Sequence, residues 1–121
     1  MENEVSKKNL SLIIPAHNAE HIIENSVIEY SNIFSDFENF EIIIVCNACT
    51  DDTLEVVTKL AEKYPIEILN IPHRGKGNAL RRGFDKAKYD LMGFLDSDNP
   101  FSLKKIKEME YSLEDYDIAI A

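Results

Sequence analysis

The chain has 121 residues, of which 45% are hydrophobic and 29% charged, and its formal net charge is -9. This balance is typical of one globular domain, taken here as residues 1–121 with residues 1–8 as a flexible lead. The acidic charge argues against nucleic-acid binding. No apolar run is long enough to span a membrane and the N-terminus lacks a signal peptide, which favours a cytoplasmic location, with membrane association only in a longer version of the protein.

Apolar strands and amphipathic helices alternate along the chain. The expected strands, apolar almost throughout, are Leu10–Pro15, Phe40–Cys46, Ile66–Ile71, Asp90–Leu95 and Asp117–Ala121. The expected helices, with apolar residues at helical spacing, are Ala19–Phe34, Asp51–Tyr64, Asn78–Lys88 and Ser102–Leu113. This order predicts an α/β fold with a Rossmann-like, mostly parallel sheet and helices on both faces. The last strand begins at the end of the sequence, which indicates a truncated sheet with an open edge.

Chemically reactive side chains follow the expected strands. Ligands of open parallel sheets bind beyond the carboxyl ends of the strands, so this edge is the expected functional one. The residues concerned are His17 and Glu20 after the first strand, Asn47 after the second, residues 74–77 after the third and residues 96–99 after the fourth.

The segment Asp96-Ser97-Asp98 directly follows the fourth strand. Two carboxylates two residues apart can converge on a hard divalent cation, which prefers oxygen ligands and leaves positions open for phosphate oxygens. The alternative is an ordinary polar turn before a helix. We predict that Asp98 and Asp96 bind Mg²⁺ or Mn²⁺.

A glycine-rich basic segment, Arg74-Gly75-Lys76-Gly77, follows the third strand, and Arg81 lies just beyond it. Glycines let the backbone approach an anion, a helix N-terminus offers free N–H groups, and the basic side chains neutralise phosphate. The spacing fits neither a Walker loop nor a GxGxxG dinucleotide fingerprint. The segment predicts an anion site, and the alternative is a turn that merely needs glycine.

Cys46 and Cys49 form a CxxC pair. In a cytosolic chain such a pair suggests redox chemistry or half of a zinc site. Zinc would need two more ligands, for which His17 and His73 are the plausible sources besides carboxylates. We favour the interpretation that both are structural thiols.

Four segments, taken in order, resemble the motifs of family 2 glycosyltransferases of the GT-A fold: LSLIIPAHNAE, EIIIVCNACTDDT, PHRGKGNALRRG and GFLDSDNP. This group includes the dolichol-phosphate mannose synthases, and the resemblance covers Leu10 to Ala121. It implies that the chain is the nucleotide-sugar-binding half of an inverting, metal-dependent enzyme. The implied donor is a nucleoside-diphosphate sugar and the implied acceptor a glycan or a lipid phosphate. The acceptor-binding half and the catalytic base would lie beyond this chain.

The resemblance also implies roles for individual residues. The implied nucleotide-sugar contacts are Pro15, Ala16, His17, Glu20, Asn47, Lys76, Arg81, Asp96 and Ser97. His17 stands where the family commonly has tyrosine, and Asn47 where it has the acid that contacts the base, so the identity of the base is left open. Pro100 stands where some relatives have a glutamine ligand, and no third metal ligand is expected there.

Three other functions fit parts of the sequence. The chain could be a non-catalytic nucleotide-binding or regulatory module that forms a homodimer through its open sheet edge. A thioredoxin-like redox protein would use Cys46 and Cys49, but it leaves both the acidic and the glycine-rich segments unexplained. A nucleotidyltransferase is expected to have a glycine-rich loop after the first strand, where the sequence reads PAHNAE.

Overall fold

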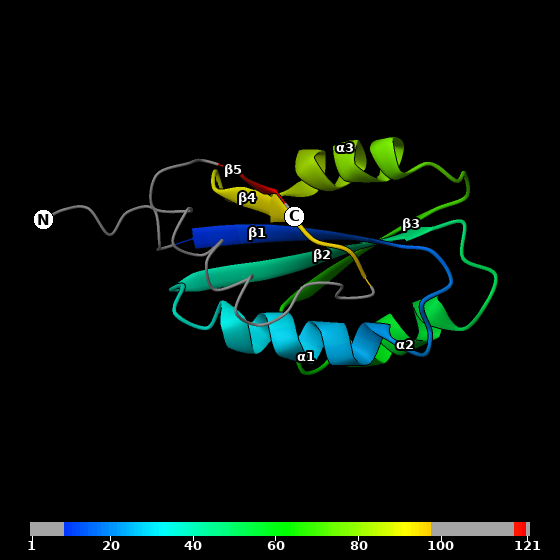
Figure 1. The fold of residues 1–121 in the computed structure, drawn as a ribbon, viewed down its shortest axis with the longest axis horizontal. Coiled ribbons are helices and arrows are strands. Elements are labelled where there is room, and N and C mark those ends of the chain that lie inside the picture. Colours follow the sequence, from blue (N-terminus) through cyan, green and yellow to red (C-terminus); the bar gives the residue numbers. More distant parts are fainter. Residues whose placement is uncertain (1–8, 98–117, 121) are drawn as a thin grey trace, which may run out of the picture.

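The computed structural model of the chain describes residues 9–97 and 118–120, which form five strands and three helices (Figure 1). In chain order they are β1 (Asn9–Ala16), α1 (Ile23–Ile33), β2 (Asn39–Asn47), α2 (Thr53–Leu60), β3 (Ile66–Ile71), α3 (Lys76–Lys86), β4 (Met92–Phe94) and β5 (Ile118–Ile120). The helix expected at Ser102–Leu113 lies outside the described residues.

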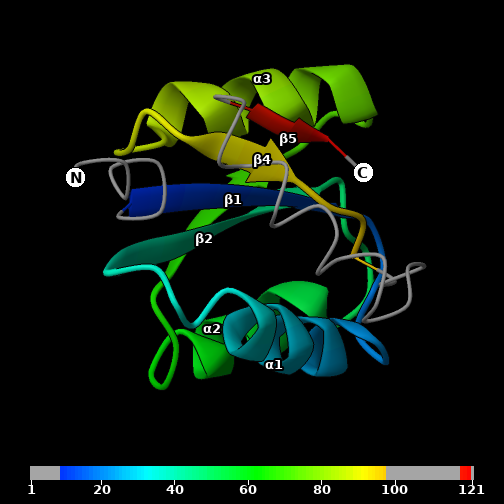
Figure 2. The ribbon, with the colours of Figure 1, turned by 60° about the vertical axis from the view of Figure 1, so that its left-hand side comes forward.

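The strands form one sheet in the order β3-β2-β1-β4-β5, and each neighbouring pair is parallel. Figure 2 shows α1 and α2 on one face of the sheet and α3 on the other. The chain moves outward from β1 to β3 and then returns across the sheet to β4, so right-handed crossovers place the helices on opposite faces. The expected Rossmann-like α/β fold is confirmed.

Each face of the sheet carries its own hydrophobic core, because successive side chains of a strand point to opposite faces. On the face of α3, Ile13, Ile43 and Val45 pack with Ala79. On the other face, Leu12, Ile14, Ile42 and Ile44 pack against side chains of α1 and α2. The central strands are therefore buried on both faces, which explains their continuous apolar sequences.

Helix α3 approaches β1 closely at Gly83. A Cβ atom at this position would lie 2.6 Å from Cγ2 of Ile13, a side chain with no exposed surface. Glycine is therefore required here by the short distance between helix and sheet. This contact fixes the position of α3 and, with it, of the residues at the N-terminus of the helix.

The expected helix bounds are wrong at several ends, and the reasons are visible. Helix α1 begins at Ile23, not at Ala19, because residues 20–22 form a turn in which the N–H groups of Ile22 and Ile23 both donate to the carbonyl oxygen of Ala19. Helix α2 is also shorter than expected, and α3 begins and ends two residues early. After α3, the N–H group of Lys88 donates to the buried carboxylate of Glu41, 2.8 Å away, which draws the chain out of the helix.

The last two strands are short. β4 covers Met92–Phe94, where Asp90–Leu95 was expected, and it pairs with β1 on one side and β5 on the other. The expected C-terminal strand is confirmed at Ile118–Ile120. Within the part of the chain that the structure describes, no helix has the length and apolar character needed to cross a bilayer.

Candidate functional site

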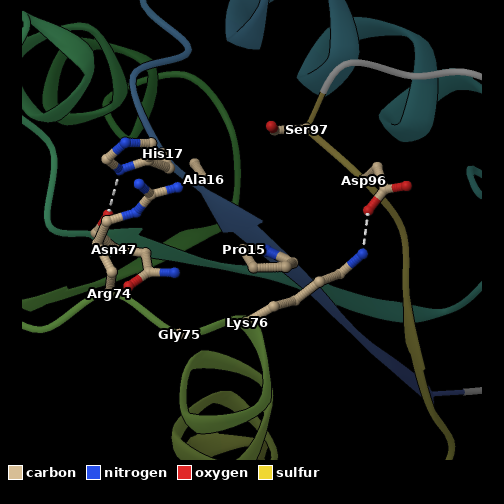
Figure 3. A pocket seen from close by; sticks show the side chains of 9 residues that line it. All are labelled: Pro15, Ala16, His17, Asn47, Arg74, Gly75, Lys76, Asp96 and Ser97. Carbon is tan, nitrogen blue, oxygen red and sulfur yellow. Dashed lines mark hydrogen bonds and ion pairs between the residues drawn. The ribbon is translucent and has the colours of Figure 1, made fainter.

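A pocket of about 680 Å³ opens at the carboxyl edge of the sheet (Figure 3). The carboxyl ends of β1 and β2 and the segments that follow β3 and β4 contribute to it. Its lining residues are Pro15, Ala16, His17, Asn47, Arg74, Gly75, Lys76, Asp96 and Ser97. The pocket lies where the chain reverses its direction across the sheet, beside β1 and β4, and this is the usual ligand site of such folds.

One side of the pocket is formed by His17 and Asn47 (Figure 3). Nδ1 of His17 lies 2.7 Å from the backbone carbonyl oxygen of Asn47. Because a carbonyl oxygen only accepts, Nδ1 carries the hydrogen and donates it, which leaves Nε2 free of a proton in the neutral ring. The bond holds the imidazole in one orientation, and it joins the ends of β1 and β2 across the pocket wall.

The side chain of Asn47 has an unmet hydrogen bond. The residue is 6% exposed, and its Oδ1 atom is buried without a partner among the described residues. A buried, unpaired amide oxygen costs roughly 1–3 kcal/mol. Because Asn47 also lines the pocket, rotation of its amide group would turn this acceptor toward a ligand. The residue is therefore suited to hydrogen bonding with a bound polar ring.

The N-terminus of α3 faces the pocket through Gly75 and Lys76. Gly75 has a φ of +141°, a conformation that other residues rarely adopt, and no side chain of the described residues caps the helix. The first N–H groups of an uncapped helix need acceptors, and the helix dipole is positive at this end. Together with the positive charge of Arg74, this terminus has the features that suit an anion.

Lys76 and Asp96 meet across the other side of the pocket. The Nζ atom of Lys76 lies 2.8 Å from Oδ1 of Asp96, and the side chains are 56% and 36% exposed. The pair joins the loop after β3 to the loop after β4. An exposed ion pair stabilises a protein by only about 0–1 kcal/mol, so either group can exchange its partner for a ligand at little cost.

Helix α1 fixes the backbone of the segment after β4. The Tyr30 hydroxyl donates to the carbonyl oxygen of Asp96 at 2.9 Å, and the Ser26 hydroxyl donates to that of Ser97 at 2.6 Å. Both donors are buried on α1. Sequence reasoning missed this support because Tyr30 fits the apolar helix pattern, and only its phenol group in a core position could have indicated a polar partner.

Two of the expected site residues that the structure describes, Glu20 and Arg81, are not among those that line the pocket. Oε1 of Glu20 accepts from the N–H of Asp52 at 2.7 Å, and its Oε2 pairs with His21. The guanidinium of Arg81 donates to Oδ1 of Asn78 within the exposed part of α3. Asp98 lies outside the described residues. Conversely, Arg74 and Gly75 line the pocket and were absent from the expected contacts, although the glycine-rich basic segment contained both.

The two cysteines are free and lie on the His17 side of the pocket. Burial raises the pKa of the Cys46 thiol from 9.0 to about 12, and Cys49 and Asp51 add to the rise. The Cys49 thiol donates to the carbonyl oxygen of Ala16 at 3.4 Å. A thiol with so high a pKa is a poor nucleophile at neutral pH. The burial of Cys46 therefore favours a structural role for that thiol.

The pocket offers oxygen ligands of the kind that Mg²⁺ and Mn²⁺ prefer. Asp96 is the acidic residue among its lining side chains, and its Oδ1 atom is paired with Lys76. In residues 9–97 and 118–120 there is no cluster of three histidine, cysteine or acidic side chains. A cation held by one or two carboxylates and by phosphate oxygens of a substrate fits this donor set.

Comparison with known proteins gives a consistent result. The model of the family described as Glycosyl transferase family 2 matches residues 11–121. The probable glycosyltransferase YdaM of Bacillus subtilis is 33% identical over 103 residues, which are 81% of this chain and 24% of that protein. The dolichyl-phosphate beta-glucosyltransferase ALG5A of Trichomonas vaginalis is 32% identical over 113 residues, 87% of this chain and 35% of that protein. The chain thus spans only about a quarter to a third of these relatives.

One solved structure has the same fold as this chain and a similar sequence. Glucosyl-3-phosphoglycerate synthase from Mycobacterium tuberculosis, crystallised with Mn²⁺, UDP and glucosyl-3-phosphoglycerate, has a TM-score of 0.63 and 27% identity. The match covers 79% of this chain and 36% of that one. The fold, the motifs in their order and the family model lead to one assignment: the chain belongs to glycosyl transferase family 2.

Proposed function

We propose that the chain forms the donor-binding and metal-binding part of a glycosyltransferase. The enzyme transfers a sugar from a nucleoside-diphosphate sugar to an acceptor hydroxyl or lipid phosphate, with inversion at the sugar. The family supports the reaction class, and the relatives support the ligands: one is a dolichyl-phosphate glucosyltransferase and another was crystallised with UDP and Mn²⁺.

The observation that carries the proposal is the meeting of Lys76 and Asp96 in one pocket. These residues come from different loops, and each has a partner of opposite charge in a bound metal–diphosphate complex. Lys76 and the N-terminus of α3 suit the phosphates, and Asp96 suits the metal or the ribose and sugar hydroxyls. The same pocket extends to His17 and Asn47, which suit a nucleobase.

The described residues would act mainly by binding and electrostatic stabilisation. His17 and Asn47 orient the nucleoside, while Arg74, Lys76 and the free N–H groups of α3 stabilise the charge that grows on the leaving diphosphate. Asp96 and Asp98 of the same segment would hold the metal, which would supply Lewis-acid stabilisation of that diphosphate. Glu20 and Arg81 are proposed to contact the ribose and the diphosphate only after their side chains leave their present partners.

Calorimetric titration tests this proposal. UDP, GDP and their sugar conjugates are titrated into the 121-residue chain with and without Mn²⁺, and the titrations are repeated with Asp96→Asn, Asp98→Ala and Lys76→Met. We expect binding by the wild type that Mn²⁺ strengthens. Asp98→Ala should remove the effect of Mn²⁺ on the nucleotide affinity. Lys76→Met should lower the affinity for nucleoside diphosphates by about tenfold and leave the affinity for a free nucleoside unchanged.

The outcomes separate this function from its competitors. Nucleotide binding that is indifferent to Mn²⁺ in every variant would support a regulatory nucleotide-binding module instead. An absence of binding, together with fast thiol alkylation at pH 7, would support redox chemistry. Arg82→Met is the matched control, because it removes a positive charge from the same helix outside the pocket lining and should leave all affinities within about twofold.

A further inference from the structure

The loop after β1 and the loop after β2 are joined by a network of hydrogen bonds. The N–H of Ala19 donates to Oγ1 of Thr53 at 2.7 Å, and this hydroxyl donates in turn to Oδ1 of Asp51 at 2.5 Å. The N–H of Glu20 donates to Oδ2 of Asp51 at 3.3 Å. In the opposite direction, the N–H of Asp52 donates to Oε1 of Glu20 at 2.7 Å. The bonds run both ways between the loops.

Asn18 adds a second set of contacts. Its Oδ1 accepts from the N–H groups of Thr50 at 2.8 Å and Asp51 at 3.3 Å, and its Nδ2 donates to Oγ1 of Thr50. The residue has a φ of 52°, a left-handed conformation that asparagine tolerates better than most residues. Asn18 therefore suits this position in both backbone and side chain.

The centre of the network is buried, so its bonds are costly to lose. Thr53 is 0% exposed and Ala19 is 3% exposed. Removal of the threonine hydroxyl would leave the Ala19 N–H group buried without an acceptor. Desolvation raises the pKa of Asp51, but hydrogen bonds from the side chain and N–H of Thr53 and from the N–H of Glu20 outweigh it and lower that pKa from its ordinary value. The Asp51 carboxylate is ionised at neutral pH and accepts from both loops.

This network lies next to two residues that line the pocket. His17 directly precedes Asn18, and Asn47 lies three residues before Thr50. The bond of 2.7 Å from Nδ1 of His17 to the carbonyl oxygen of Asn47 spans the same two loops (Figure 3). The position of the imidazole relative to the Asn47 amide thus depends on how the loops are held together.

We propose that Asn18, Asp51 and Thr53 are positioning residues that fix the spacing of His17 and Asn47 and so set the affinity of the pocket for the nucleoside part of the donor. This inference rests on the proposed function, because it assigns that wall of the pocket to the nucleoside. It differs from a general stabilising role in one respect: it concerns the nucleoside and not the diphosphate, which is bound on the Lys76 side.

The test compares Thr53→Val, which has the shape of threonine without the hydroxyl, with Thr53→Ser, which keeps the hydroxyl. Affinities for UDP and for inorganic pyrophosphate, both with Mn²⁺, are measured by calorimetry. We expect Thr53→Val to lower the affinity for UDP by about tenfold, which is the equivalent of one hydrogen bond. The affinity for pyrophosphate should fall by less than about twofold. Thr53→Ser should bind UDP within about threefold of the wild type. Thr58→Val is the matched control, because that hydroxyl donates to the carbonyl oxygen of Leu54 within α2.

A second pair of variants keeps the test decisive if Thr53→Val fails to fold. Asn18→Gly keeps the left-handed backbone and removes the side chain, whereas Asn18→Asp keeps the acceptor for Thr50 and Asp51. Asn18→Gly should lower the affinity for UDP more than that for pyrophosphate, and it should speed hydrogen exchange of the Thr50 amide. Asn18→Asp should keep both the UDP affinity and the exchange rate near those of the wild type. UDP and pyrophosphate affinities that fall together, or do not fall, would overturn the positioning role. If the wild type binds GDP and not UDP, the same comparison is made with GDP; no binding of either nucleotide by the wild type would instead refute the proposed function.

Discussion

The two sides of the pocket are held together in different ways. On the His17 side, the loops after β1 and β2 are joined by several hydrogen bonds, some of them buried. On the opposite side, the segments after β3 and β4 meet through an exposed ion pair between Lys76 and Asp96. The first side holds its shape without a ligand. The second holds two charges that bind each other only weakly. A pocket built in this way presents a rigid wall to a planar ring and exchangeable charges to a metal–diphosphate group.

The two sides differ because the nucleobase and the metal–diphosphate group are recognised by different interactions. A nucleobase is recognised by shape and by directed hydrogen bonds, which lose affinity when their partners move, so preorganisation is favourable. A diphosphate with its cation is recognised by charge, and Lys76 and Asp96 must change partners when it binds. The hydrogen bonds of the rigid side should therefore contribute more to the stability of the protein than the Lys76–Asp96 ion pair, and four sets of variants examine the two sides and the packing behind them.

The largest effect is expected at Gly83, which anchors the helix that carries Lys76. In Gly83→Ala the new Cβ would lie 2.6 Å from the buried Ile13 side chain, and such overpacking should lower the free energy of unfolding by about 2–3 kcal/mol in urea denaturation. Gly77→Ala is the control, since its added methyl group would meet no atom of the described residues within 4 Å and alanine favours a helix. Equal effects of the two variants would show that α3 is loosely packed on the sheet.

The next effect concerns Cys46 on the rigid side. Its folded-state pKa of about 12 exceeds the ordinary value of 9.0, so the protonated thiol favours the folded state. This stability is fully present below pH 9 and is lost as the pH rises toward 12, by about 1.4 kcal/mol for each pH unit. Between pH 8 and pH 10.5 the wild type should lose about 2 kcal/mol more than Cys46→Ala in urea unfolding. Parallel pH profiles would mean that water reaches Cys46 and that this side is not tightly packed.

A smaller effect is expected at Tyr30, which supports the exchangeable side from α1. Tyr30→Phe removes the hydroxyl that donates to the carbonyl oxygen of Asp96 and should lower the free energy of unfolding by about 1 kcal/mol. The Mn²⁺-dependent affinity for UDP should fall with it, because the backbone of Asp96 is then less well held. If stability falls while UDP affinity with Mn²⁺ is unchanged, the position of Asp96 does not depend on α1.

The smallest effect is expected for the ion pair itself. A double-mutant cycle with Lys76→Met and Asp96→Asn, measured by urea unfolding, should give a coupling energy of about 0.5 kcal/mol or less, because both side chains are exposed. This coupling energy should decrease further in about 0.5 M salt, because the salt screens the two charges. A salt-independent coupling well above about 1 kcal/mol would contradict the view that these charges readily exchange partners.

The course of the strands and the functional edge of the sheet were predictable from the sequence. Continuous apolar segments such as Phe40–Cys46 identify buried parallel strands, and the right-handed rule then places the helices. The four loops with reactive side chains were assigned to one edge, and His17, Asn47, Lys76 and Asp96 do line one pocket there. Such features depend on local patterns and on general rules of chain connection.

What the sequence by itself determined is thus the strand pattern, the α/β class and the family; what only the tertiary structure decided is the partner of each polar side chain. Nothing near Glu20 in the sequence indicates that its carboxylate accepts from the N–H of Asp52, or that Tyr30 reaches Asp96. The physical reason is that apolar periodicity depends only on residues that are close together in the sequence. A hydrogen bond between distant segments depends instead on sheet register and on turn conformation to within a few tenths of an ångström.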